Sequence, residues 1–334
     1  MFNVLVNSEY HILFNDLKAK SPDSFDLTMV DFSSPDEKLN TLLCTTDSII
    51  GRVNLSDGQY ESADRLKLIQ TLNSGFDQID LAKADRYNVM IATNNGSNAN
   101  SVAEHVLMLI FALFRQLLFH HNSVTNGPWK NLKHTNIELS GKTLGIYGLG
   151  RIGKELAKKA LALDVKIQYF DILRQFDVEK ELDLKYVFPE ELLKKSDILS
   201  YHVPKTTFTH KIINQTSLKM MRSNSLLINA SRGDVQDENA IYQALISGEI
   251  YAAGLDVFEV EPLPQNSPLR DLKNVVLTPH SAPDRECYVR AVNHALENLL
   301  KVSKGEVPQS LAVNYEKETH KFLELFPDVK FFTS

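Results

Sequence analysis

Three residues whose side chains suit proton and hydride chemistry each follow a short apolar segment of the 334-residue chain. The segments and the residues that follow them are Ser225–Asn229 with Arg232, Ala252–Leu255 with Glu261, and Val275–Leu277 with His280. An arginine can hold a carboxylate and a neighbouring carbonyl with two parallel hydrogen bonds. A histidine can give a proton at neutral pH, and a nearby carboxylate can keep it charged and oriented. Together these groups suit hydride transfer to a 2-keto acid.

Each of the three residues also has an ordinary structural explanation when it is considered alone. Arg232 can form a surface ion pair, Glu261 can be a solvated loop acid, and His280 can be an imidazole whose hydrogen bonds are satisfied at a strand end. Their common position after strand-like segments favours the chemical interpretation, because ligands of parallel sheets bind beyond the carboxyl ends of the strands.

The elements that must position these residues are short apolar strands alternating with helical patterns, which predict an α/β fold with parallel sheets. In the first hundred residues the expected strands are Asn3–Val6, Leu42–Ile50, Leu68–Leu72 and Val89–Thr93. A largely apolar helix is expected from near Ser101 to beyond Phe114, and a final amphipathic helix from Pro283 to about Lys304. Between them, six strands with intervening helices predict one doubly wound sheet, at Thr143–Tyr147, Lys166–Phe170, Ile198–His202, Ser225–Asn229, Ala252–Leu255 and Val275–Thr278.

A glycine motif of the GxGxxG type lies between the first of these six strands and the helix that follows, which is the context of a dinucleotide-binding turn. Gly148 permits the tight turn, Gly150 lets a pyrophosphate approach the backbone, and Gly153 lets the helix pack on the strand. The amides of Arg151 and Ile152 are then expected to point at the phosphates, with the helix dipole behind them.

An acidic residue should follow at the end of the second strand, where it accepts hydrogen bonds from the ribose hydroxyls. Asp171 stands at that position, after Lys166–Phe170. Its charge should also repel a 2′-phosphate, which favours NAD over NADP as the cofactor. Arg174, three residues further on, leaves NADP open, because an arginine there can pair with that phosphate.

Composition excludes several classes of protein. With 43% hydrophobic and 23% charged residues and a formal net charge of −6, the chain is expected to be a globular protein that binds neither nucleic acid nor a membrane surface. The two cysteines, Cys44 and Cys287, favour a reducing cytoplasm, and no metal site is expected. The longest apolar run, Val106–Phe114, is too short to cross a bilayer, and the apolar run near the N-terminus is too short for a signal sequence, so neither is expected.

Together the motifs resemble the D-isomer-specific 2-hydroxyacid dehydrogenase family over about Leu66 to Asn314. The segments that carry the resemblance, besides the glycine motif, are Leu72–Asp77, Asn98–His105, Asn229–Gly233, Asp256–Phe258 with Glu261–Pro262, and Thr278–His280. The resemblance implies a Rossmann-type NAD domain, residues 99–282, inserted into a smaller flavodoxin-like substrate domain. That second domain would comprise residues 1–98 and 283–334. Its last segment, Tyr315–Ser334, extends beyond the family pattern, and its aromatic residues suit packing either on the same subunit or on a partner.

The resemblance also implies a role for individual residues. Arg232 would bind the substrate, His280 would be the acid/base and Glu261 would pair with it. The remaining implied contacts are Ser74, Gly75 and Asn98 with the substrate, Ala230 and Asp256 with the nicotinamide end, and Val203 and Pro204 with the adenosine. A homodimer joined through the NAD domains is also implied.

The expected activity is therefore NAD-dependent interconversion of a small 2-keto acid and its D-2-hydroxy acid, with glyoxylate or hydroxypyruvate as typical substrates. The side chain of the acid is not fixed by the sequence. Two alternatives remain: an NAD-sensing binding protein of the same fold that is not an enzyme, and another oxidoreductase of the family, such as a formate dehydrogenase.

Overall fold

A computed structural model describes residues 1–33, 37–94, 96–127, 129 and 136–332. The chain divides into two compact units. The first consists of Met1–Asn98 and Pro283–Asn314, and the second consists of Ala99–Ala282 and Tyr315–Ser334. The second unit therefore interrupts the first in the sequence, and each has its own sheet and its own hydrophobic core.

The first unit is built on a parallel five-stranded sheet of order β2-β1-β3-β4-β5, which is the flavodoxin-like order. Its strands are β1 (Phe2–Asn7), β2 (Phe25–Val30), β3 (Ser48–Ile50), β4 (Leu68–Gln70) and β5 (Met90–Ala92). Its helices are α1 (His11–Lys20), α2 (Glu37–Leu43), α3 (Asp57–Ser62), α4 (Leu81–Arg86) and α12 (Arg285–Ser303). Separate core clusters form where α1 and α12 pack and where α2, α3 and α4 pack.

Two predictions for this unit were wrong in detail. The apolar stretch Leu42–Ile50 is not one strand, because α2 ends at Leu43 and only Ser48–Ile50 pairs with its neighbours. The strand Phe25–Val30 was not predicted at all. It lies at the edge of the sheet with a mixture of buried and exposed residues, so its sequence lacks the continuous apolar run of the central strands.

The second unit is built on a parallel seven-stranded sheet of order β12-β11-β10-β9-β6-β7-β8. Its strands are β6 (Thr143–Tyr147), β7 (Lys166–Phe170), β8 (Lys185–Tyr186), β9 (Ile198–Tyr201), β10 (Leu226–Asn229), β11 (Ala252–Leu255) and β12 (Val275–Leu277). Six were predicted, and the two-residue edge strand β8 was missed. The order confirms the doubly wound, Rossmann-type class, in which the chain starts at the middle of the sheet and reverses direction there.

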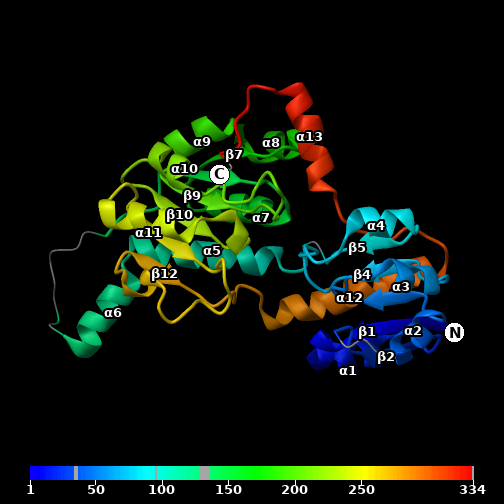
Figure 1. Ribbon diagram of the computed structural model, residues 1–334. Coiled ribbons are helices and arrows are strands. Elements are labelled where there is room, and N and C mark those ends of the chain that lie inside the picture. The colour runs from blue at the N-terminus through cyan, green and yellow to red at the C-terminus, as the bar shows by residue number, and fades with distance from the viewer. Residues whose placement is uncertain (34–36, 95, 128, 130–135, 333–334) are drawn as a thin grey trace. The chain divides into compact units, whose positions relative to one another are not determined.

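Helices cover both faces of this sheet, with α9 and α10 on one side and α5 on the other (Figure 1). The helices are α5 (Ala99–Phe114), α6 (Leu117–Asn126), α7 (Arg151–Leu161), α8 (Phe176–Leu182), α9 (Pro189–Lys195), α10 (Gln215–Met220), α11 (Glu238–Ser247) and α13 (Tyr315–Leu325). Ten of the sixteen residues of α5 are buried, as its apolar sequence predicted. Among the described residues no single helix could span a membrane by length and hydropathy; α5 and α6 pass that test only as a pair, across a bend of 58°.

The C-terminal segment belongs to the second unit, which corrects its expected place in the substrate domain. Phe322 of α13 is 5% exposed and packs on Phe170, with ring centroids 5.7 Å apart. Phe331 lies against the same ring at 6.0 Å. Burial of these aromatic rings on β7 is the physical reason why the segment lies on this unit.

Candidate active site and cofactor site

The glycine motif forms the turn from β6 into α7, and two of its glycines are required by close approach. Gly148 has a φ of +99°, and a Cβ there would lie 2.6 Å from the carbonyl oxygen of His202. A Cβ on Gly153 would lie 2.4 Å from the carbonyl oxygen of Gly148. Any side chain at either position would collide with backbone atoms, so glycine is the residue that this tight turn and close packing allow.

Gly150 differs, because a Cβ there would meet open space. It is the N-cap of α7, whose first turn contains Arg151 and Ile152. The first N–H groups of a helix have no acceptor within the helix, and the helix dipole makes that end favourable for an anion. The turn therefore presents backbone amides to an open space, which is what a pyrophosphate requires.

Asp171 follows β7 and is tied to this turn. One of its carboxylate oxygens accepts a hydrogen bond from the amide of Leu149 at 2.7 Å, and the other accepts one from the amide of Leu173 at 2.9 Å. Burial raises the pKa of the Asp171 carboxyl to about 6, and the hydrogen bonds from backbone amides oppose this rise. The carboxylate thus joins the ends of β6 and β7, the place at which a ribose would be bound.

Arg174 is engaged away from Asp171. Its guanidinium donates two hydrogen bonds to the carboxylate of Glu179, at 2.8 and 2.9 Å. It also lies over the rings of Phe176 and Tyr186, 4.7 and 4.6 Å from their centroids. These contacts hold the guanidinium against Glu179 and the two rings. To pair with a 2′-phosphate, it would have to leave Glu179.

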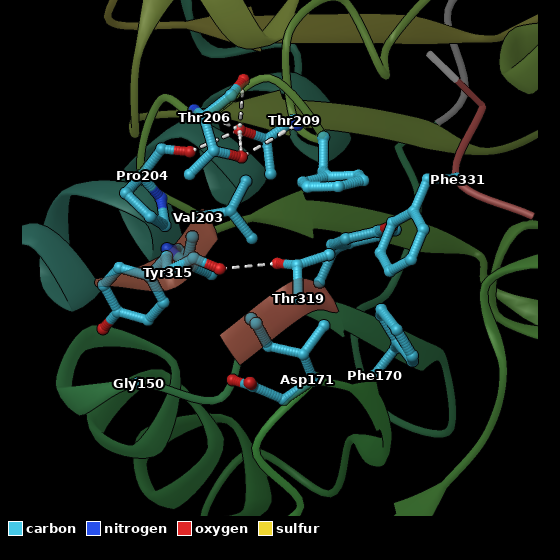
Figure 2. A pocket seen from close by; sticks show the side chains of 15 residues that line it. Gly150, Phe170, Asp171, Val203, Pro204, Thr206, Thr209, Tyr315, Thr319 and Phe331 are labelled. Atoms are coloured by element: carbon cyan, nitrogen blue, oxygen red, sulfur yellow. Dashed lines mark hydrogen bonds between the residues drawn. The ribbon is translucent and has the colours of Figure 1, made fainter. Parts of the chain in front are cut away.

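A cavity of about 60 Å³ lies beside the glycine turn and Asp171 (Figure 2). Val203 and Pro204, the residues expected to border an adenosine, line it, and so do three residues of the C-terminal segment, Tyr315, Thr319 and Phe331. The other lining residues are Tyr147, Gly148, Gly150, Phe170, Asp171, Ile172, His202, Thr206, Phe208 and Thr209.

Two polar atoms in the walls of this cavity are buried without a hydrogen-bond partner among the described residues: the hydroxyl of Tyr147 and Nδ1 of His202. The other ring nitrogen of His202 lies 2.9 Å from Oγ of Ser200. Burial disfavours the charged imidazolium and lowers the pKa of His202 to about 4. A buried polar atom left unpaired costs about 1–3 kcal/mol, so these two atoms favour a ligand that carries polar groups.

The predicted catalytic pair is formed at the carboxyl edge of the same sheet. Nδ1 of His280 lies 2.8 Å from a carboxylate oxygen of Glu261, and both side chains are partly exposed. The other carboxylate oxygen of Glu261 accepts a hydrogen bond from the amide of Phe258 at 3.1 Å, which fixes the carboxylate. A histidine bound in this way at Nδ1 presents Nε2 to a reactant.

Arg232 follows β10 on a loop that two neighbouring residues hold in place. Asn229, fully buried, donates to the carbonyl oxygen of Arg232 and accepts from the amide and hydroxyl of Ser231. A Cβ on Gly233 would lie 1.8 Å from the carbonyl oxygen of Phe258, so the loop passes directly against the β11 loop. Because β10, β11 and β12 are adjacent and parallel, the loops with Arg232, Glu261 and His280 share one edge of the sheet.

Asp256 anchors the loop that carries His280, and sequence reasoning did not find this network. Its carboxylate, 1% exposed, accepts hydrogen bonds from Oγ1 of Thr278 at 2.6 Å and from the amide of Ser281 at 3.0 Å. His105 of α5 places Nε2 3.2 Å from the same carboxylate. Burial opposes ionisation of this carboxyl, but hydrogen bonds from the two side chains and from the loop amide outweigh burial and lower its pKa.

In the first unit, the predicted substrate contacts lie on loops after neighbouring strands. Ser74 follows β4 and donates through its hydroxyl to Oδ1 of Asn98, which follows β5, at 2.8 Å. The structure therefore brings Ser74 and Asn98 together, with Gly75 next in the chain. Ala230 of the second unit is 9% exposed and belongs to a hydrophobic core.

Known proteins share both the sequence and the fold. Residues 107–282 match the family model described as D-isomer specific 2-hydroxyacid dehydrogenase, NAD binding domain. A glyoxylate reductase of Thermofilum pendens is 41% identical over 284 residues, which are 83% of this chain and 82% of that protein. A hydroxypyruvate reductase of Thermotoga maritima is 40% identical over 222 residues, 66% of this chain and 72% of that protein. The chain belongs to this family.

The fold of this D-2-hydroxyacid dehydrogenase is similar to that of solved structures. A D-lactate dehydrogenase from Aquifex aeolicus, complexed with NAD and lactic acid, has a TM-score of 0.77 and 28% identity, and the match covers 93% of this chain and 99% of that one. The protein is an NAD-dependent oxidoreductase of the 2-hydroxyacid dehydrogenase family, and NAD is its cofactor. The open space at Gly150, the amides of the α7 N-terminus and the unpaired polar atoms of the cavity fit that cofactor.

Proposed function

We propose that this dehydrogenase reduces a small 2-keto acid to the 2-hydroxy acid, glyoxylate to achiral glycolate or hydroxypyruvate to the D-2-hydroxy acid, and catalyses the reverse oxidation. The observation that carries the proposal is the 2.8 Å contact of His280 with Glu261 at the sheet edge that also bears Arg232. The relatives from Thermofilum pendens and Thermotoga maritima, a glyoxylate reductase and a hydroxypyruvate reductase, support this choice of substrate.

Each residue has one task in this mechanism. NADH, held by the glycine turn and Asp171, would supply the hydride that the keto carbon receives. The guanidinium of Arg232 holds the substrate carboxylate and polarises the keto oxygen. As negative charge develops on that oxygen, Nε2 of His280 gives it a proton, and Glu261 keeps the ring oriented and stabilises its charged form. In the oxidation direction, His280 takes the proton back.

We also infer the roles of the binding residues from the family resemblance. The Gly148–Gly153 turn with the α7 amides would hold the pyrophosphate, Asp171 the ribose hydroxyls, and Val203 with Pro204 the adenosine. Ala230 would border the nicotinamide, and Asp256, through its buried network, would position the His280 loop. In the first unit, Ser74, Gly75 and Asn98 would contact the substrate, so that unit, Met1–Asn98 with Pro283–Asn314, would be the substrate domain.

The direct experiment measures NADH oxidation with glyoxylate, hydroxypyruvate or pyruvate as the substrate. Carbon dioxide, the product of formate oxidation, is added to the panel to test for formate dehydrogenase activity. We expect turnover with at least one of the first three acids, and a large loss of kcat in His280→Asn with NADH binding retained. If the purified protein binds NADH but turns over none of these 2-keto acids, the proposed activity is contradicted and a non-enzymatic NAD-sensing role gains support.

We propose further that the protein is a homodimer joined through α5 and α6. Met108 and Phe111 of α5 and Leu117 and Leu118 of α6 are exposed, although ten of the sixteen residues of α5 are buried. Apolar side chains gathered on adjoining helices are typical of an interface. Sedimentation at micromolar concentration should give the dimer mass, and Phe111→Glu should shift it toward the monomer; a monomeric wild type contradicts this proposal.

We place the enzyme in a reducing compartment, the cytoplasm. Cys44 and Cys287 are both free, which is the ordinary state of thiols in the cytosol. Cell fractionation tests this location, and recovery of the enzyme outside the cytoplasmic fraction contradicts it.

A further inference from the structure

The C-terminal segment, residues 315–332, is fixed to the second unit at three points along its length. At its start, the carboxylate of Glu316 accepts hydrogen bonds from the amide of Thr207 at 2.6 Å and from its hydroxyl at 2.7 Å. In the middle, the buried ring of Phe322 packs on Phe170. At the end, Nδ2 of Asn214 donates to the carbonyl oxygen of Phe332. Because the segment is held at both ends and in the middle, it is a fixed part of the second unit.

This segment faces the cavity at the end of β7. Tyr315, Thr319 and Phe331 line the cavity from the segment's side, and Figure 2 shows Phe331 near Phe170. Burial, together with the neighbouring Asp171 carboxylate, raises the pKa of the Tyr315 hydroxyl. The space that the glycine turn and Asp171 border is therefore closed by residues more than 140 positions further along the chain.

The cavity walls suit a flat aromatic group. One wall belongs to the part of the second unit that precedes the C-terminal segment, and it contains the apolar residues Phe170, Val203 and Pro204. The other wall belongs to the C-terminal segment and contains the rings of Tyr315 and Phe331. Aromatic rings contribute strongly to the binding of nucleobases, which have both an apolar face and polar edges. The unpaired Tyr147 hydroxyl and His202 Nδ1 in the same walls can satisfy such polar edges.

We propose that the C-terminal segment is the outer wall of the adenosine end of the NAD site, and that Tyr315 and Phe331 contact the adenine ring. This inference rests on the proposed function only for the presence of NAD in the site. The segment sets the affinity for the cofactor and takes no part in the proton or hydride step. The three anchors favour a fixed wall over a plug that must leave before the cofactor can enter.

The test compares cofactor binding by full-length Tyr315→Ala, Tyr315→Phe and Phe331→Leu with that of the wild type, by calorimetry with NADH and with ADP-ribose. We expect the dissociation constant of Tyr315→Ala to rise about tenfold for both ligands, because one aromatic contact with the base is lost. Phe331→Leu should weaken both ligands in the same direction, whereas Tyr315→Phe, which keeps the ring, should bind like the wild type.

The matched control is Phe326→Ala. Phe326 belongs to the same segment and packs on Phe188 and Phe322, but it does not line the cavity. Its loss should lower the melting temperature and leave both dissociation constants within twofold of wild type. With reduced nicotinamide mononucleotide as hydride donor, which has no adenosine, Tyr315→Ala should turn over substrate at the wild-type rate.

Several results would overturn the inference. Unchanged NADH affinity in both Tyr315→Ala and Phe331→Leu would show that the segment does not contact the cofactor. Tighter binding in these variants would identify it as an obstruction, and equal weakening in Phe326→Ala would reduce its effect to general packing. If the wild type binds NADH but reduces no 2-keto acid, the proposed activity is refuted, and the binding experiments still decide whether the segment contacts the cofactor. If the wild type binds neither NADH nor ADP-ribose, both the proposed activity and the inference about the segment are refuted.

Discussion

The preference for NADH over NADPH should depend on pH through Asp171. The carboxyl has a pKa of about 6 because burial disfavours its charge. Because that pKa is raised, the group is ionised at pH 8, about two units above it, and protonated at pH 5, about one unit below it. At pH 5 roughly ten carboxyl groups are neutral for each ionised one. Protonation removes the negative charge that repels a 2′-phosphate, so selectivity should fall as pH falls through 6.

The magnitude follows from the charge and its surroundings. Two like charges about 4 Å apart near a protein surface repel by about 4 kcal/mol, and partial exposure to solvent reduces this to about 2 kcal/mol. That repulsion corresponds to roughly a 30-fold preference for NADH at pH 8. Asp171→Asn removes the charge and keeps one acceptor for the amide of Leu149 or Leu173, so it should lower the preference to a few-fold at every pH. Asp171→Ala should loosen it further, with some loss of stability.

The assay is the ratio of kcat/KM for NADH to kcat/KM for NADPH between pH 5 and 8, because kcat/KM reports on groups of the free enzyme. The phosphate itself titrates near pH 6, so the Asp171→Asn profile is the control for that effect. Arg174→Gln is a second control, and it should leave the NADPH value unchanged because the guanidinium is engaged by Glu179. A wild-type preference that does not change with pH, or an equally selective Asp171→Asn enzyme, refutes the reasoning.

Three further outcomes follow from the loops at the sheet edge. Gly233→Ala should lower the melting temperature and cut kcat/KM, since its Cβ would lie 1.8 Å from the Phe258 carbonyl oxygen, whereas Gly58→Ala, which meets open space, should not. Asp256→Asn should cost about 1–3 kcal/mol of unfolding free energy, measured with urea, because its buried network loses a charged acceptor. The Asp256 pKa is lowered on folding, so its stabilisation is present above about pH 4 and should vanish in more acidic urea titrations, where Asp256→Asn and wild type converge.

The sequence predicted best where a local pattern and a physical requirement coincide. The strand before Gly148 and the helix after it were placed correctly because the turn between them demands glycine at two positions. The family resemblance implied the pairing of Glu261 with His280, and the two side chains do meet although the residues are 19 positions apart. Glu261 follows β11 and His280 follows β12, and the carboxyl ends of these adjacent parallel strands lie at the same edge of the sheet.

The sequence predicted least where long-range packing decides. The partner of His105 lies 151 positions away in Asp256, and nothing near His105 distinguishes it from any other polar residue on an apolar helix. The C-terminal segment carried an aromatic pattern, but the position of the Phe170 ring at the end of β7 determines where those rings are buried. Edge strands such as β8 were missed because two residues give no periodicity.

The most direct measurement of the central claim is glyoxylate and hydroxypyruvate reduction by His280→Asn at saturating NADH. The account predicts a fall in kcat of about 10²–10⁴-fold, because the general acid is lost, with an unchanged NADH dissociation constant and an unchanged melting temperature. An enzyme that keeps kcat within a few-fold of wild type would contradict the account and would leave His280 and Glu261 as an ordinary surface pair.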